Sequence, residues 1–140
     1  MDIAAFNRHV IEQFRANGGK GMIGDRIDAG KLLLLTHTGA RSGKRRTTPL
    51  MFLRLNGRLC VIASANGAPR HPDWYRNVVA HPAVTVEIGD EEFPATAVVP
   101  SGRERDELFE EAVRQQPFFT EHQSRAGRTI PVVELRRADA

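Results

Sequence analysis

The sequence is poor in the residues that build disulfides and metal sites. One cysteine, Cys60, stands among 140 residues, so no internal disulfide can form. Because its neighbours are apolar, we expect Cys60 to lie on a buried strand of a protein kept in the reducing cytoplasm. The five histidines show neither HxH nor HExxH spacing, and with a single cysteine to join them they predict no metal site.

Long apolar runs are also absent. The longest aliphatic run, residues 32–35, is far too short to cross a bilayer. The N-terminal residues show no basic stretch followed by an apolar one, so we expect no signal peptide. Charged residues make up 26% and hydrophobic residues 41% of the chain, which is typical of a globular protein. This length and composition predict one domain over residues 1–140.

Motifs that would supply a nucleophile are missing as well. There is no GxSxG elbow, no CxxC pair and no P-loop. If the protein is an enzyme, we expect a bound cofactor to supply the reactive centre. The chain would then supply binding, orientation and electrostatics.

The most unusual segment is a basic turn, residues 38–49, which lies between two apolar strand-like segments. Its four cations, four hydroxyl side chains and two glycines are Arg41, Lys44, Arg45, Arg46, Thr38, Ser42, Thr47, Thr48, Gly39 and Gly43. The chain has 20 Lys and Arg against 17 Asp and Glu, and without these four cations the balance is 16 against 17. Such groups match phosphate oxygens, so the turn predicts an anion site. The alternative is a solvated hairpin tip.

Apolar residues at helical spacing predict an amphipathic helix over residues 3–16, within an N-terminal segment 1–17. Its apolar stripe either packs on the body of the protein or contacts a membrane surface. A second helix is expected from Ser101, where Glu104 completes a capping box, and a shorter one is expected from Pro72. About four helices are expected in all.

Apolar patterns with strand periodicity predict six strands. They cover residues 31–37, 47–55, 58–64, 84–88, 93–99 and 129–136, and the glycine-rich residues 18–30 are assigned as irregular. Asn56-Gly57 predicts a two-residue hairpin, and Pro49 is expected near the start of its strand or on a sheet edge. Strand pairs are too closely spaced for regular βαβ units, so the sequence predicts an α+β domain with an antiparallel, barrel-like sheet.

A second segment, residues 64–77, joins a strand end, a Gly/Pro loop and a helix start, and it carries the only Trp and the only Tyr. Polar groups at a strand end beside a helix N-terminus are a common place to hold a ring and an anion. Each residue also has a plainer interpretation. Trp74 and Tyr75 would be core aromatics, His71 a surface cap and Ser64 a strand-end hydroxyl.

Three blocks, residues 38–50, 64–77 and 128–133, resemble in order and spacing the deazaflavin-dependent nitroreductase family of actinobacteria. The resemblance implies a split β-barrel of the FMN-binding type with flanking helices. It also implies the 8-hydroxy-5-deazaflavin coenzyme F420, whose ribityl phosphate and polyglutamate tail are anionic, with FMN the less favoured cofactor. In its reduced form this coenzyme serves the family in reducing quinones, enones or nitro compounds.

Residue by residue, the resemblance divides the coenzyme between the two segments. The phosphate and tail would lie on Arg41, Ser42, Arg46 and Thr48, and we expect Lys44 and Arg45 to complete this anion clamp. The ring would contact Pro49, Leu50, Ala63, Ser64, Ala65, Trp74 and Asn77.

The substrate wall departs from the family pattern. Where relatives place tyrosines over the substrate, this chain has Gln116, Phe119 and His122, which implies a more apolar wall. We expect Ser64 to donate a hydrogen bond to the acceptor oxygen as the hydride arrives. The proton would come from solvent, Tyr75 or His122.

The sequence therefore predicts an oxidoreductase that passes a hydride from reduced F420 to a hydrophobic, electron-poor small molecule such as a quinone. The alternative is a carrier that only binds a flavin, deazaflavin, haem or fatty acid in the same pocket. A nucleic-acid binder is disfavoured, because residues 38–49 contain no aromatic side chain. The sequence does not predict the oligomeric state.

Overall fold

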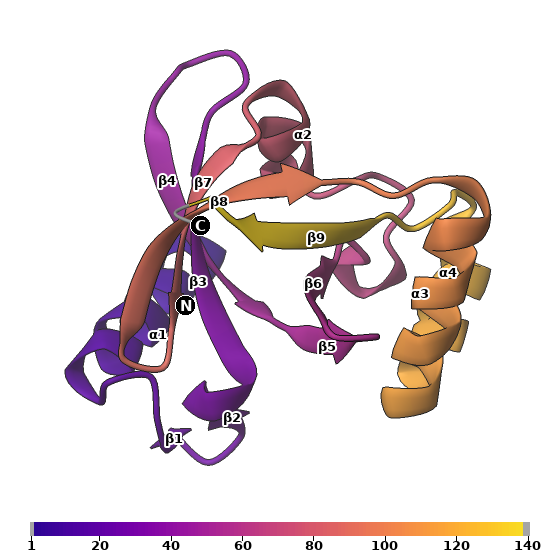
Figure 1. Ribbon diagram of the computed structural model, residues 1–140. Coiled ribbons are helices and arrows are strands. Elements are labelled where there is room, and N and C mark those ends of the chain that lie inside the picture. The colour runs from indigo at the N-terminus through magenta and orange to yellow at the C-terminus, as the bar shows by residue number, and fades with distance from the viewer. Residues whose placement is uncertain (1, 139–140) are drawn as a thin grey trace.

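Seven strands form one antiparallel sheet in the order β4-β3-β7-β8-β9-β6-β5 (Figure 1). The computed structural model describes residues 2–138. The strands are β3 (Leu32–Thr38), β4 (Arg45–Met51), β5 (Leu53–Leu55), β6 (Arg58–Ile62), β7 (Ala83–Ile88), β8 (Glu91–Val98) and β9 (Val132–Arg137). The sheet curls into an open half-barrel, which confirms the predicted α+β fold with an antiparallel, barrel-like sheet.

The connection between β4 and β5 explains the curl. These strands lie at opposite edges of the sheet, yet only Phe52 separates them in the chain. The prediction of a single strand over residues 47–55 is therefore wrong, because the ladder with β3 ends at Met51 and the ladder with β6 begins at Leu53. One segment that supplies both edge strands brings the two edges together, and β4 then faces β6 across the opening of the half-barrel.

Local turn chemistry matches the prediction at two places. Asn56 and Gly57 have φ values of 51° and 81°, so the two-residue hairpin between β5 and β6 is confirmed. Pro49 lies on the edge strand β4 opposite Leu34, where no second neighbouring strand needs the N–H that proline lacks.

Four α-helices flank the sheet: α1 (Ile3–Ala16), α2 (Asp73–Ala80), α3 (Gly102–Gln115) and α4 (Phe118–Ala126). In Figure 1, α3 and α4 lie together at one end of the molecule and α1 at the other. Two details of the prediction need correction. The Ser101 side chain makes no capping hydrogen bond, and Glu104 pairs instead with Arg58 on β6 at 2.9 Å. α2 begins at Asp73, with Pro72 as its N-cap residue.

Short elements occupy segments that the sequence analysis assigned differently. β1 (Met22–Ile23) and β2 (Ile27–Asp28) pair as a two-stranded ribbon, followed by the 3-10 turn η1 (Ala29–Lys31). The irregular assignment of residues 18–30 is thus incomplete. A second 3-10 turn, η2 (Ala65–Gly67), precedes α2.

Apolar side chains are buried in three clusters. Representative members are Leu33, Leu35, Val61 and Trp74 inside the curl, Cys60, Leu108 and Phe109 under α3 and α4, and Val10, Phe14 and Leu34 under α1. α1 therefore packs on the body of the protein with one face, while Ile3 and Phe6 at its start remain exposed. Within residues 2–138, no helix is long and apolar enough to cross a bilayer, and no group of His, Cys, Asp or Glu side chains is placed to hold a metal ion.

Candidate functional site

A cavity of about 210 Å³ lies where β4 faces β6 across the opening of the half-barrel. Its walls are Pro49, Leu50, Met51, Ile62, Ser64, Ala65, Trp74, Phe118 and Phe119. Six of these residues are among the predicted ring and substrate contacts, and the structure brings them together from three distant segments. Met51, Ile62 and Phe118 are absent from the prediction. The cavity has apolar walls and one hydroxyl, that of Ser64.

The basic turn runs from the end of β3 into β4. It reaches this cavity, because its last residue, Pro49, belongs to the cavity wall. Backbone bonds close the turn: Gly39 N–H donates to the Lys44 carbonyl at 2.8 Å, and Gly43 N–H donates to the Gly39 carbonyl at 3.0 Å. The Ser42 hydroxyl accepts from Lys44 N–H at 3.1 Å. A Cβ atom at Gly39 would collide with this hydroxyl oxygen unless the Ser42 side chain moved.

The cations of the turn are exposed and, within residues 2–138, none of them forms an ion pair with a carboxylate. Their positive field is therefore uncompensated, which suits an anionic ligand. A second cavity, of about 290 Å³, has the opposite character, because Glu87, Asp90, Glu91 and Glu92 line it. Charge thus favours the cavity beside the basic turn for a ligand that carries phosphate.

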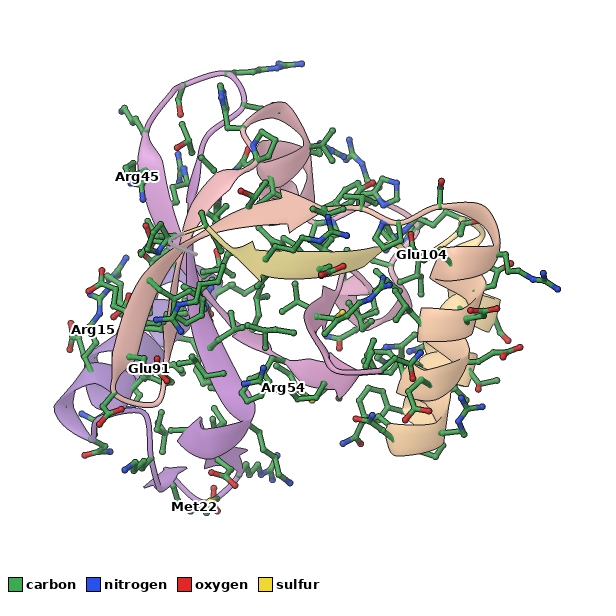
Figure 2. All side chains as sticks on the ribbon, viewed as in Figure 1. Arg15, Met22, Arg45, Arg54, Glu91 and Glu104 are labelled. Atoms are coloured by element: carbon green, nitrogen blue, oxygen red, sulfur yellow. The ribbon has the colours of Figure 1, made fainter. Side chains whose placement is uncertain are left out.

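Strand alternation places two neighbouring arginines on opposite faces of β4. Arg45 donates to the Thr85 hydroxyl on β7 at 3.1 Å, on the face that α1 covers. Arg46 lies opposite His37, on the same face as Thr48 and Leu50 and toward α2. Figure 2 labels Arg45 on the side of β4 away from α2. The predicted clamp is therefore divided between the two faces of β4, with Arg46 on the face of Thr48 and Leu50 and Arg45 on the face of Pro49.

A buried polar network links the basic turn to α2. Asn77 accepts from the backbone N–H of Ala40 at 2.9 Å, and its amide nitrogen lies 3.0 Å from His37 Nδ1. His37 Nε2 lies 2.9 Å from the hydroxyl of Thr48. Burial, with the positive charges of Arg46 and Arg45 as smaller causes, lowers the pKa of His37 to about 4, so its ring is neutral at pH 7. Sequence reasoning included Thr48 and Asn77 but missed His37.

The loop that carries Ser64 is strained and pinned. Ala65 and Asn66 have φ values of 47° and 56°, a left-handed backbone conformation that residues with a Cβ atom rarely adopt. The Arg128 guanidinium donates to the carbonyls of Ala63, Ser64 and Ala68 at 3.3, 3.0 and 3.0 Å, and to His71 Nδ1 at 2.9 Å. One arginine thus holds three carbonyls of this loop. The sequence analysis quoted Arg128 only as part of a motif and assigned it no role.

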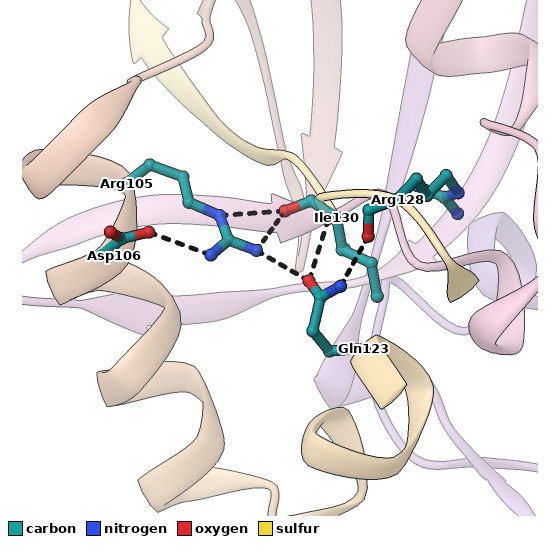
Figure 3. A network of polar contacts seen from close by, with 5 residues as sticks. All are labelled: Arg105, Asp106, Gln123, Arg128 and Ile130. Atoms are coloured by element: carbon teal, nitrogen blue, oxygen red, sulfur yellow. Dashed lines mark hydrogen bonds and ion pairs between the residues drawn. The ribbon is translucent and has the colours of Figure 1, made fainter. Parts of the chain in front are cut away.

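A second network holds Arg128 in place (Figure 3). The Gln123 side chain on α4 donates to the Arg128 carbonyl at 2.5 Å and accepts from Ile130 N–H at 3.0 Å. Arg105 on α3 donates to the Ile130 carbonyl at 2.7 Å and to the Gln123 side chain at 3.0 Å. Side chains of α3 and α4 therefore both hold the segment between α4 and β9. Because Arg128 belongs to this segment, they also hold the Ser64 loop that Arg128 contacts.

The start of α4 supplies an aromatic wall. The rings of Phe118 and Phe119 lie 4.5 Å apart, with Phe119 buried and Phe118 partly exposed. The His122 ring packs against both, with its centroid 5.2 Å from that of Phe118, and its Nδ1 is buried without a hydrogen-bond partner in residues 2–138. Neither His122 nor Gln116 lines the cavity, whereas Phe119 does. Tyr75 also lies outside the lining, with its ring against His71.

Comparison with known proteins decides the family. A family model described as F420H(2)-dependent quinone reductase matches residues 6–136. The chain belongs to this family. It is similar to the F420H(2)-dependent quinone reductase Rv1261c of Mycobacterium tuberculosis, with 36% identity over 98% of this chain and 99% of that protein. The predicted resemblance to deazaflavin-dependent oxidoreductases is confirmed.

Solved structures agree with this assignment. A structure described as an F420-H2-dependent reductase, FDR-A, shares 40% identity with a TM-score of 0.68 and covers 83% of this chain and 99% of its own. A domain-swapped dimer shares 36% identity with a TM-score of 0.70, covering 96% and 100%. HutZ of Vibrio cholerae, described as a haem storage protein, shares only 14% identity with a TM-score of 0.60 over 96% and 92%, which shows the fold alone. Membership in the family makes the protein an F420-dependent oxidoreductase, and the fold is a split barrel.

Proposed function

We propose that this protein reduces a quinone with a hydride from F420, bound across the basic turn and the cavity between β4 and β6. The observation that carries the proposal is the juxtaposition of uncompensated cations and an apolar cavity on one strand, β4. A deazaflavin coenzyme needs both, because its tricyclic ring is flat with apolar faces while its phosphate and tail are anionic. The residues present therefore fit the coenzyme that the family name implies.

The residues divide the work by position. Arg46 and Thr48 share the face of β4 that carries Leu50 of the cavity wall and would hold the phosphate, with Arg41 and Lys44 of the basic turn available to the acidic tail. The ring would lie among the apolar walls, next to Trp74. Arg45 points to the other face, where it bonds Thr85, so we assign it no direct contact.

When bound, reduced F420 supplies a hydride. The Phe118 and Phe119 rings offer an apolar surface against which a quinone ring can stack. The Ser64 hydroxyl, which lines the cavity, would donate a hydrogen bond to the acceptor oxygen as negative charge develops on it. Because His122 and Tyr75 lie outside the lining, we propose that solvent delivers the proton.

The decisive experiment titrates the protein with oxidised F420 and with FMN, and then measures menadione reduction by reduced F420. Quenching of Trp74, the only tryptophan, reports binding at the cavity. Turnover supports the proposal, binding of F420 without turnover of quinones, enones or nitro compounds indicates a carrier, and absence of F420 binding refutes both.

A pair of variants tests the clamp. Arg46→Ala should weaken F420 affinity by roughly 1.5–3 kcal/mol, the value of a charge-assisted hydrogen bond. Arg45→Ala should weaken it less, because Arg45 lies on the face of β4 opposite to Arg46 and donates to the Thr85 hydroxyl. Arg103→Ala on α3, whose side chain is 93% exposed, is the control that removes one positive charge elsewhere. Equal losses in all three variants would mean that only net charge matters.

We also propose that α1 contacts a membrane surface. Ile3 and Phe6 are exposed at 80% and 44%, and a lipid surface would cover them. Cosedimentation with vesicles, comparing the wild type with Ile3→Ser, tests this contact. Equal pelleting of both would remove it.

A further inference from the structure

His37 is a buried titratable side chain that the proposed function does not yet use. Only 2% of its surface is exposed, and it lies near the end of β3, immediately before the basic turn. Leu33 and Leu35, which share its face of the strand, are apolar members of the core inside the curl. A polar ring at such a position costs free energy unless each of its nitrogens has a partner. Both nitrogens of His37 have such a partner.

The direction of each hydrogen bond follows from one backbone group. Ala40 N–H can only donate, so the atom of Asn77 that it contacts is the carbonyl oxygen and the amide nitrogen faces His37. His37 Nδ1 must then accept, which places the ring proton on Nε2, next to the Thr48 hydroxyl oxygen. The Thr48 oxygen accepts a hydrogen bond from Nε2–H of His37, so the hydroxyl proton of Thr48 is directed away from His37.

We propose that His37 is a positioning residue for the coenzyme's phosphate. Through Thr48 it holds the hydroxyl with its proton turned outward as a donor, and through Asn77 it fixes the first residues of the basic turn. The inference rests on the proposed function, since the ligand so positioned is F420. Burial lowers the pKa of His37, which keeps the Nδ1 lone pair free for Asn77 at neutral pH.

Both arms of this network end at the polar side of the site. The Thr48 arm ends on β4, two residues from Leu50 in the cavity wall and two from Arg46. The Asn77 arm ends at Ala40, next to Arg41. Among residues 2–138, no hydrogen bond of the His37 side chain reaches a residue that lines the cavity. The proposal therefore predicts an effect on phosphate recognition that leaves ring binding unchanged.

Two conservative variants separate the arms. His37→Asn presents an acceptor near the position of Nδ1 and loses the donor to Thr48, whereas His37→Gln presents a donor near the position of Nε2 and loses the acceptor for Asn77. Each is titrated with oxidised F420 and with 8-hydroxy-5-deazariboflavin, which has the ring and ribityl chain without the phosphate. Loss of one hydrogen bond at the phosphate should weaken F420 binding to His37→Asn by about tenfold. Affinity for the phosphate-free compound should stay within about twofold, and His37→Gln should bind F420 more tightly than His37→Asn.

A double-mutant cycle identifies Thr48 as the intermediary. If His37 acts through the hydroxyl, His37→Asn should have no further effect on F420 affinity in a Thr48→Val background. In the ligand-free wild type, ¹⁵N chemical shifts at pH 7 should show a neutral His37 ring with its proton on Nε2. A protonated ring, the other tautomer, or equal loss of affinity for both ligands would overturn the inference. A wild type that binds neither ligand would instead overturn the proposed function.

Discussion

Acid should destabilise this protein in large part through a buried side chain, His37. In the unfolded chain a histidine titrates near 6.5, and burial lowers the pKa of His37 in the folded protein to about 4. Between these two values the unfolded state binds more protons than the folded state, so the free energy of unfolding falls as pH decreases. The contribution of His37 is fully present above pH 6.5 and is lost as pH falls toward 4.

The difference between a pKa of 6.5 in the unfolded chain and about 4 in the folded protein corresponds to about 3 kcal/mol in the free energy of unfolding. About 2 kcal/mol of this is lost by pH 5. This is a large share of the roughly 5–15 kcal/mol that holds a typical domain folded. Because only 2% of the His37 surface is exposed, solvent screens this effect little.

The measurement is urea unfolding of the wild type and His37→Gln between pH 7.5 and 5, followed by Trp74 fluorescence. His71 also has a lowered pKa, from desolvation and the nearby Arg128 charge, so the wild type carries a second acid-sensitive group. Since His71 is present in both proteins, their difference isolates His37. His81→Gln, at an exposed position, is the matched control. If stabilities of wild type and His37→Gln run parallel across this range, His37 does not titrate as argued.

Three further outcomes follow from the same contacts. Arg128→Lys keeps the charge but loses the fork that holds three carbonyls, so urea unfolding should show a loss of about 1–3 kcal/mol, against little change for Arg125→Lys, which loses one exposed contact. Cys60 is buried and its pKa is raised to about 12, mainly by desolvation, so it should not react with a thiol reagent at pH 8 until the protein is unfolded. Ala65→Gly should raise the free energy of unfolding by about 0.5–1 kcal/mol in urea titrations, because Ala65 has φ 47°; an unchanged or lower value would show that the left-handed conformation stores no strain there.

The sequence predicted most clearly what depends on neighbouring residues. The Asn56-Gly57 hairpin and the edge position of Pro49 follow from backbone chemistry within a few residues, and both are found. The capping box at Ser101 is also a local pattern, yet the Ser101 side chain makes no capping hydrogen bond, and Glu104 pairs with Arg58 from a strand distant in the chain.

The two residues that the sequence analysis missed, His37 and Arg128, have partners that lie far away in the sequence. His37 acts with Asn77, 40 positions away in the chain, and Arg128 holds Ser64 across 64 positions. No spacing rule connects such pairs, because their contact depends on the order of strands in the sheet. For His37 a weaker signal existed, since a polar residue continues a buried apolar face with period two.

The arrangement of β4 limits which ligands the site can take. Arg46 and Leu50 lie on one face of this strand, four residues apart, and at the usual rise per residue their Cα atoms are separated by about 13 Å. A compact anion cannot meet both, whereas an extended molecule whose anionic group is held away from its ring can. The same hairpin carries the cations at one end and the cavity wall at the other, so curling of the sheet, which the β4–β5 connection enforces, assembles both parts of the site at once.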